Sequence, residues 1–103
     1  MNRLKPHKEL LQHLAKASEQ TAKAVLRTLD SEQTQVIGEI FDNLLGGAIK
    51  LHSTNKAAIA PYADIIRKLA SRKIKSKTRR SLLAKHSQIV SLVLKALLPK
   101  LYK

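Results

Sequence analysis

Cysteine is absent from the 103-residue chain, and this absence removes three kinds of chemistry together. Without it the chain can form no disulfide, no thiol nucleophile and no Cys-based zinc site. Aromatic residues are almost as scarce and occur only at Phe41, Tyr62 and Tyr102. The remaining apolar residues are mainly Leu, Ile and Ala, which suit helix-on-helix packing better than a β-sandwich. We therefore predict an all-α protein.

The chain also lacks the sequence motifs of enzyme active sites. It contains no P-loop, no G-x-S-x-G motif and no Gly-rich phosphate cradle. The histidines show no metal-binding spacing and lie at His7, His13, His52 and His86. Glu39 and Asp42 are one turn apart, and we interpret them as the solvated face of a helix. We expect no catalytic residue, no metal and no cofactor, and hence a protein that is not an enzyme.

Long hydrophobic runs are missing as well. The N-terminus lacks the apolar core of a secretory signal, and no apolar run reaches the 18 or so residues that span a bilayer. The richest run, 89–98, is ten residues long and includes Lys95. With 44% hydrophobic residues, the chain has enough apolar surface for one modest core. We expect a soluble protein with a single helical domain over 1–103.

Apolar residues recur at helical spacing in five or six short segments, which predicts a compact bundle. These segments cover about 10–17, 22–29, 36–48, 54–69 and 77–97, and the stripe over 36–45 is the widest. A wide stripe is typical of a helix with neighbours on two sides, so we place 36–45 at the centre of the core.

Short polar residues and turn formers indicate where these helices begin and end. Ser18 and Ser76 have the side chains of N-caps, and Asp30 with Gln33 matches a capping box. Ser53 or Thr54 is expected to cap the fourth helix. The predicted interruptions and ends lie at Gly46-Gly47, Pro61, His86-Ser87 and Pro99. The break at Ser18 could also be slight enough to leave one bent helix.

Charge is distributed very unevenly along the chain. The formal net charge is +13, and the segments 1–29, 30–47 and 48–103 carry net charges of +4, −4 and +13. The stretch from Arg67 to Lys85 has nine basic residues and no acid. These nine form the predicted nucleic-acid-binding site: Arg67, Lys68, Arg72, Lys73, Lys75, Lys77, Arg79, Arg80 and Lys85. A polyanion would relieve their mutual repulsion.

The placement of these bases indicates contact with phosphates. The segment 67–85 reads as two helices joined by a basic turn, which loosely resembles a helix-turn-helix. Lys77, Arg79 and Arg80 fall in the first helical turn, where the helix dipole disfavours cations unless an anion is bound. The segment has no aromatic residue for stacking on single strands and no Asn or Gln for reading adenine. We therefore expect binding to double-stranded DNA without sequence readout. A solvated face that serves solubility is the simpler alternative.

The C-terminal segment after residue 86 is the other candidate for function. It is almost entirely apolar except for a narrow stripe at Ser87, Ser91 and Lys95. Burial in the protein's own core is the simplest interpretation of such a helix. Its apolar side could alternatively form an oligomer contact, or a membrane contact for which the lack of Trp is unfavourable. The residues assigned to that contact are Ile89, Val93, Leu94 and Leu97.

The order of four segments resembles a known group of proteins. The segments are LLQHLAKA, AVLRTLD, IGEIFDNLLGG and IIRKLASRKIKSKTRRSLLAKH, and together they span about 10–86. This pattern resembles the small basic helical proteins encoded by Maverick/Polinton and adintovirus-like (adenovirus-like) elements. The resemblance implies a virus- or transposon-derived protein that associates with packaged DNA, in the nucleus or the virion.

Three functional hypotheses follow from these patterns. The first is a DNA-binding or DNA-condensing protein, with self-association as a means to avid binding. The second is a virion-structural or protein-interaction module whose bases bind an acidic capsid or host protein. The third is a membrane-active C-terminal helix.

Overall fold

The helices expected from the hydrophobic pattern are present in the computed structural model, which describes residues 2–47, 51 and 53–101. The chain begins with a 3-10 helix at Asn2–His7. The α-helices that follow are α1 (Lys8–Lys16), α2 (Glu19–Arg27), α3 (Ser31–Leu45), α4 (Ser53–Ile59), α5 (Ala63–Ala70), α6 (Ser76–Lys85) and α7 (Ser87–Leu101). No strand occurs within the described ranges. The all-α bundle is therefore confirmed, with six helices if α4 and α5 count as one interrupted helix.

Local side-chain chemistry sets several of the helix boundaries. The Ser18 hydroxyl accepts a hydrogen bond from the Thr21 amide, and Ala17 and Ser18 are extended, so α1 and α2 are separate helices. Asp30 and Gln33 form the predicted capping box at the start of α3. Gly47 has φ +79°, a left-handed conformation that favours glycine, directly after α3.

The two prolines expected to break helices behave differently: the helix is interrupted at Pro61 but continues through Pro99. At Pro61 the chain forms a 3-10 turn, Ala60–Tyr62, and then restarts as α5, as predicted. At Pro99 the prediction is wrong, because α7 continues through this residue to Leu101. Pro99 lies in the last turn, where the missing amide removes only one intrahelical hydrogen bond and few residues remain to be displaced.

Two of the predicted caps are not where the sequence placed them. Ser76 is the first residue of α6 and Lys75 occupies the N-cap position, where no side chain accepts a hydrogen bond from the helix. Ser53 is likewise inside α4, and the residue before it lies outside the described residues, as does Ala48 of the predicted third helix.

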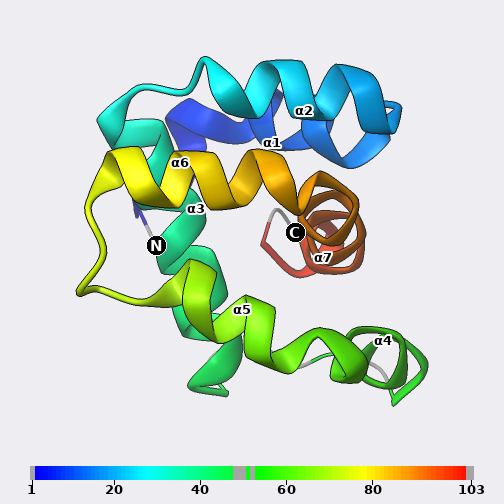
Figure 1. Cartoon of the computed structure of the whole chain (residues 1–103). Helices are drawn as coiled ribbons and strands as arrows, with labels where there is room; N and C mark the ends of the chain where they lie inside the picture. Colours follow the sequence, from blue (N-terminus) through cyan, green and yellow to red (C-terminus); the bar gives the residue numbers. More distant parts are fainter. Residues whose placement is uncertain (1, 48–50, 52, 102–103) are drawn as a thin grey trace.

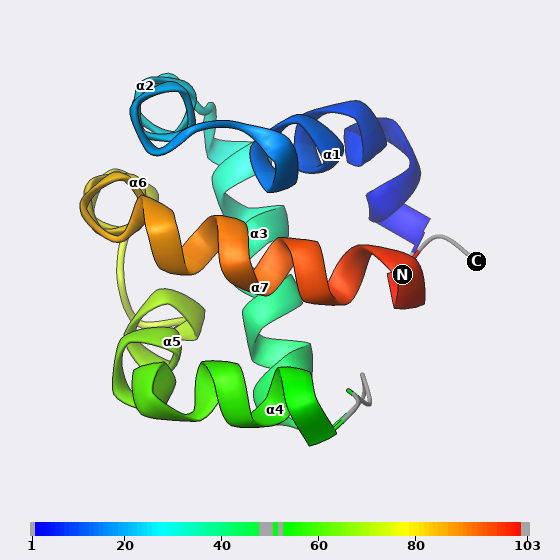
Figure 2. The ribbon, with the colours of Figure 1, turned by 90° about the vertical axis from the view of Figure 1, so that its right-hand side faces the viewer.

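The helices pack in layers around α3 and α7. Figure 1 shows α1 and α2 at the top, α6 and α7 in the middle, and α4 and α5 at the bottom. In Figure 2, α3 runs behind these layers and α7 crosses between them. Helix α3 packs against α5 and α6, whereas α7 packs against α1, α2, α4 and α6. The predicted central helix therefore shares the centre with α7.

One continuous core holds this arrangement together. Its largest fully buried side chains come from most of the helices and include Leu11, Leu26, Phe41, Leu69, Leu83 and Leu97. The domain measures 32 × 27 × 26 Å. Helices α6 and α7 meet at His86 with a bend of 91°. This bend turns α7 into the core and leaves α6 along one side of the molecule, next to α2.

Candidate nucleic-acid interface

The basic segment forms the end of α5, an extended turn and all of α6. Ser71 ends α5 in an extended conformation, and the turn then reaches Lys75, the residue before α6. Ile74 is half-buried and is the one apolar side chain within the turn, as the sequence suggested. The segment therefore has the expected helix-turn-helix connectivity, with its backbone held against the core at both ends.

Arg79 is not part of an exposed phosphate-binding surface. Only 7% of the residue is accessible to solvent. Its Nε donates a 3.0 Å hydrogen bond to the carbonyl oxygen of Leu69, and its second terminal nitrogen donates to the carbonyl oxygen of Ser71. Burial lowers the pKa of the Arg79 guanidinium, an effect that the nearby Glu39 carboxylate opposes. The assignment of Arg79 to nucleic-acid contact is therefore wrong, and the residue instead fixes α6 to the end of α5.

A glycine on α3 makes room for this buried arginine. A Cβ atom added to Gly38 would lie 2.8 Å from Arg79 Nε and 3.0 Å from its Cζ. Any larger residue at position 38 would therefore collide with the guanidinium. The fit explains why α3 carries a glycine in the middle of an otherwise regular helix.

Two other arginines of the predicted site are paired with acids. Arg67 donates to Asp64 at 2.7 Å within α5, and Arg72 donates to Asp42 on α3 at 2.8 Å. The hydrogen bond and the negative charge of Asp42 raise the pKa of Arg72. Both pairs are exposed, so they are weak and open to competition from a phosphate. The absence of acids within the segment therefore does not mean that all its cations are free.

The other six basic residues of the segment form no ion pair with any residue that the structure describes. They are Lys68, Lys73, Lys75, Lys77, Arg80 and Lys85. We call this set the α6 basic surface. All are exposed except Arg80, which is half-buried and whose Nε has no hydrogen-bond acceptor in the described part of the chain. Lys77, Ser81 and Lys85 follow one another at four-residue intervals, so they lie on one exposed side of α6.

Two of these lysines act electrostatically on the same residue, His86. Burial lowers the pKa of His86, and the positive charges of Lys85 and Lys68 lower it further. Lys68 belongs to α5 and Lys85 to the end of α6, so both helices bring cations to this point. The α6 basic surface therefore extends from the turn to the far end of α6.

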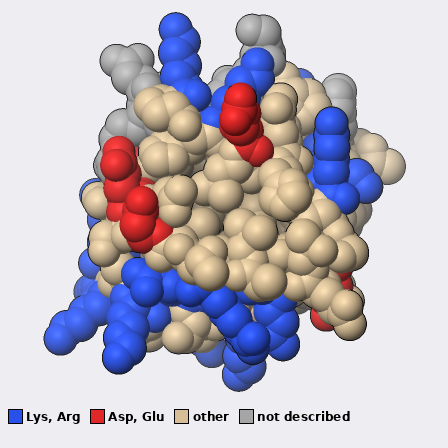
Figure 3. Space-filling model, turned by 90° about the horizontal axis from the view of Figure 1, so that it is seen from above, with Lys and Arg blue, Asp and Glu red and all other residues tan. Residues whose placement is uncertain are grey.

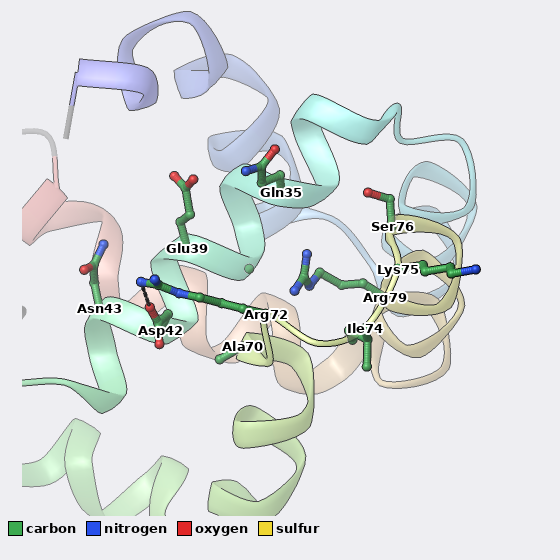
Figure 4. Close-up of a pocket in the computed structure, with 11 residues that line it drawn as sticks. Gln35, Glu39, Asp42, Asn43, Ala70, Arg72, Ile74, Lys75, Ser76 and Arg79 are labelled. Atoms are coloured by element: carbon green, nitrogen blue, oxygen red, sulfur yellow. Dashed lines mark hydrogen bonds and ion pairs between the residues drawn. The ribbon is translucent and has the colours of Figure 1, made fainter.

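A cavity of about 800 Å³ separates the turn from α3. Its polar lining includes Gln35, Glu39, Asp42, Asn43, Arg72, Lys75, Ser76 and Arg79. Figure 4 shows Arg72 and Arg79 directed toward α3, whereas Lys75 points away from it. Because carboxylates face the arginines there, the cavity is not a purely cationic phosphate cradle. The outward Lys75 belongs with the exposed bases.

Two bases of α2 add to this surface, although no pattern in the sequence assigned them to it. Lys23 and Arg27 are exposed and one turn apart on that helix, and α2 packs beside α6. Figure 3 shows Lys and Arg side chains gathered along the side of the molecule that α2 and α6 form. The four-residue spacing of these two bases was visible in the sequence, but the contact between α2 and α6 was not. The structure thus enlarges the basic surface beyond 67–85.

The predicted oligomer or membrane contact lies inside the protein. Ile89 is 9% exposed, and the other three residues assigned to it are fully buried: Val93, Leu94 and Leu97. The interpretation of these four as a contact with a second chain or a bilayer is therefore wrong for this fold. Their apolar side faces α1, α2 and α4, and burial in the core is the correct alternative.

The described residues include neither a single membrane-spanning helix nor a cluster of metal ligands. None of the helices there is both long and apolar enough to cross a bilayer alone, although α6 and α7 qualify together by length and composition despite their 91° bend. In the same residues, no three His, Asp or Glu side chains are grouped so that they could hold a metal ion.

Comparison with known proteins gives no relative for this chain. No protein-family model matches it, and neither do curated proteins or solved structures.

Proposed function

We propose that the protein is a non-enzymatic, sequence-nonspecific DNA-binding or DNA-condensing protein that contacts the phosphates of double-stranded DNA. The observation that carries this proposal is the α6 basic surface, whose six cations lack acidic partners among the described residues. Such a cluster costs self-repulsion, which a polyanion relieves. Contact with phosphates also releases condensed counterions, which provides most of the affinity of nonspecific binding.

The types of side chain on this surface favour backbone contact over reading of bases. Lysine accounts for five of the six bases, and lysine meets a phosphate as a flexible point charge. The helix α6, SKTRRSLLAK, has no aromatic residue for base stacking and no Asn or Gln for adenine. We therefore expect similar affinities for duplexes of unrelated sequence.

Only the family resemblance suggests where such a protein would act. If the chain derives from a Maverick/Polinton or adintovirus-like element, it would associate with packaged DNA in the nucleus or the virion. The same bases could also bind an acidic capsid or host protein, which is the alternative function. Burial of the C-terminal apolar residues argues against a membrane-active helix.

The test compares two triple variants that carry the same change in net charge. Lys73→Glu, Lys77→Glu and Lys85→Glu reverse three charges of the α6 basic surface. Lys56→Glu, Lys95→Glu and Lys100→Glu reverse three exposed charges on α4 and α7. Affinity for a random-sequence 20-bp duplex is then measured by fluorescence anisotropy from 50 to 200 mM salt.

We expect the first triple variant to lose most binding and the second to bind nearly as the unmodified protein does. Equal losses in the two variants would mean that net charge matters and the α6 surface does not. If the unmodified protein fails to bind duplex even at low salt, the alternative of an acidic protein partner is favoured.

A further inference from the structure

Helices α2 and α6 run side by side in opposite directions along one side of the molecule (Figure 1). Gln88 Nε2 donates a 2.8 Å hydrogen bond to Glu19 Oε2, which joins the start of α2 to the start of α7, just beyond the end of α6. The end of α2 consequently lies near the start of α6. This pairing fixes the relative position of the bases on the two helices.

Each of these helices carries its own row of exposed bases. On α2 the row is Lys23 and Arg27, and on α6 it is Lys77 and Lys85, with Arg80 half-buried on the same helix. Neither α2 base forms an ion pair with another described residue. Glu19 is the one acid of α2, and its carboxylate is engaged by Gln88 at the end of the row.

The spacing of the two rows suits a double helix. Packed helices lie about 8–10 Å apart, and the grooves of B-DNA are about 6 and 12 Å wide. Flexible Lys and Arg side chains on adjacent helices can therefore reach phosphates on the two strands that border one groove. A single row of cations could follow only one strand and would gain less from a duplex.

We propose that α2 and α6 form one two-row surface that binds both phosphate strands of duplex DNA, with Lys23 and Arg27 as its second row. This inference rests on the proposed function and specifies the form of nucleic acid that the surface accepts. The sequences of α2 and α6, EQTAKAVLR and SKTRRSLLAK, contain no aromatic residue, so the surface has nothing on which the bases of a single strand could stack.

The decisive experiment compares Lys23→Glu/Arg27→Glu with Lys56→Glu/Lys95→Glu, two double variants with the same charge change. Affinity is measured for a 20-bp duplex and for one of its separated strands across a salt series. The α2 variant is expected to lose about two phosphate contacts, which makes the log–log salt slope shallower by about 2. It should also lose affinity for duplex by at least about tenfold near 100 mM salt and most of its preference for duplex over single strand.

The outcomes separate this inference from the function on which it rests. If the unmodified protein prefers duplex and the α2 variant behaves as the α4/α7 control does, the second row is overturned while the proposed function stands. Equal affinity of the unmodified protein for duplex and single strand also overturns the second row. No binding of duplex at low salt overturns both.

A milder pair of substitutions guards against misfolding of the charge-reversed protein. Lys23→Gln/Arg27→Gln removes the two charges without introducing acids beside Glu19. The same flattening of the salt slope, by about 2, is expected from this pair. An unchanged slope in the neutral pair, with native helix content by circular dichroism, would contradict the second row.

Discussion

The guanidinium of Arg79 lies directly against Gly38, on a helix 41 positions earlier in the chain, in the space that a Cβ atom would fill. This contact joins α6 to α3, while the hydrogen bonds of Arg79 to Leu69 and Ser71 join α6 to the end of α5. The basic turn is thus held by an arginine that has itself been removed from the surface. For this reason, fewer cations are available to a ligand than the sequence of 67–85 contains.

Gly38→Ala should destabilise the protein even though alanine is the better helix former. The added methyl group would force the buried Arg79 from its carbonyl partners, at a cost of about 1–3 kcal/mol for overpacking. Helix propensity returns about 1 kcal/mol. We expect a net loss of about 1 kcal/mol in the free energy of unfolding, measured by urea denaturation.

The matched control for this substitution is Gly46→Ala. Gly46 has φ −77°, and an added Cβ would lie an ordinary 3.4 Å from the Asp42 carbonyl oxygen. Its effect should stay within about 0.5 kcal/mol. In an Arg79→Ala background, Gly38→Ala should instead stabilise the protein, because the clash has gone and the propensity gain remains. If the effect has the same sign in both backgrounds, Gly38 is not there to accommodate Arg79.

Asp42→Asn should strengthen DNA binding. Asp42 is the carboxylate that pairs with Arg72, so its neutralisation frees an exposed guanidinium beside the α6 basic surface. One additional phosphate contact would make the salt slope steeper by up to about 1. Glu9→Gln, which makes the same change in net charge on α1, is the control and should leave the slope unchanged. Weaker binding by Asp42→Asn would show that Arg72 serves only the fold.

Lys75→Ser should stabilise the protein and at the same time weaken its binding to DNA. Lys75 occupies the N-cap position of α6 without a side-chain acceptor, and serine is a preferred residue there. We expect the unfolding free energy to rise by about 1 kcal/mol while the salt slope of DNA binding becomes shallower by about 1. The control Lys73→Ser removes the same charge from the turn without providing a cap, so it should weaken binding without stabilising the protein.

Stability should fall as pH is lowered through the titration range of His86. Burial and the two nearby lysines hold the pKa of His86 below its ordinary value of 6.5, so the unfolded chain takes up this proton more readily than the folded chain does. Above about pH 6.5 the residue is neutral in both states and contributes nothing. Its penalty grows below that pH and is complete once pH lies below the folded pKa.

Urea denaturation of His86→Gln between pH 7.5 and 5 checks this prediction. The variant should lose part of the pH dependence that the unmodified protein shows. An unchanged pH profile in His86→Gln would assign the effect to other groups.

Features that depend on nearby residues in the chain were predictable. The Ser18 cap and the Asp30–Gln33 capping box need only atoms three residues apart, and both are present. The wide stripe from Val36 to Phe41 is buried as expected, because amphipathic spacing determines which side of a helix can leave water.

Features that depend on tertiary packing were not predictable from the same patterns. From the sequence alone, an arginine in a basic run is expected to be exposed. Arg79 is buried because the fold brings Gly38 and two carbonyl groups to it. The contribution of Lys23 and Arg27 likewise depends on the contact of α2 with α6. Hydrophobic periodicity shows that each helix has an inner side, but it does not specify which helix lies next to it.

The salt dependence of duplex binding by the unmodified protein is the decisive measurement of phosphate contact by this surface. Six phosphate contacts from the α6 basic surface give a log–log slope of about −5, and the two bases of α2 bring it to about −7. Measurement of the equilibrium constant for one random-sequence duplex between 50 and 200 mM salt gives this slope. We expect a slope between about −5 and −7, and a slope near zero would exclude binding to DNA through these phosphate contacts.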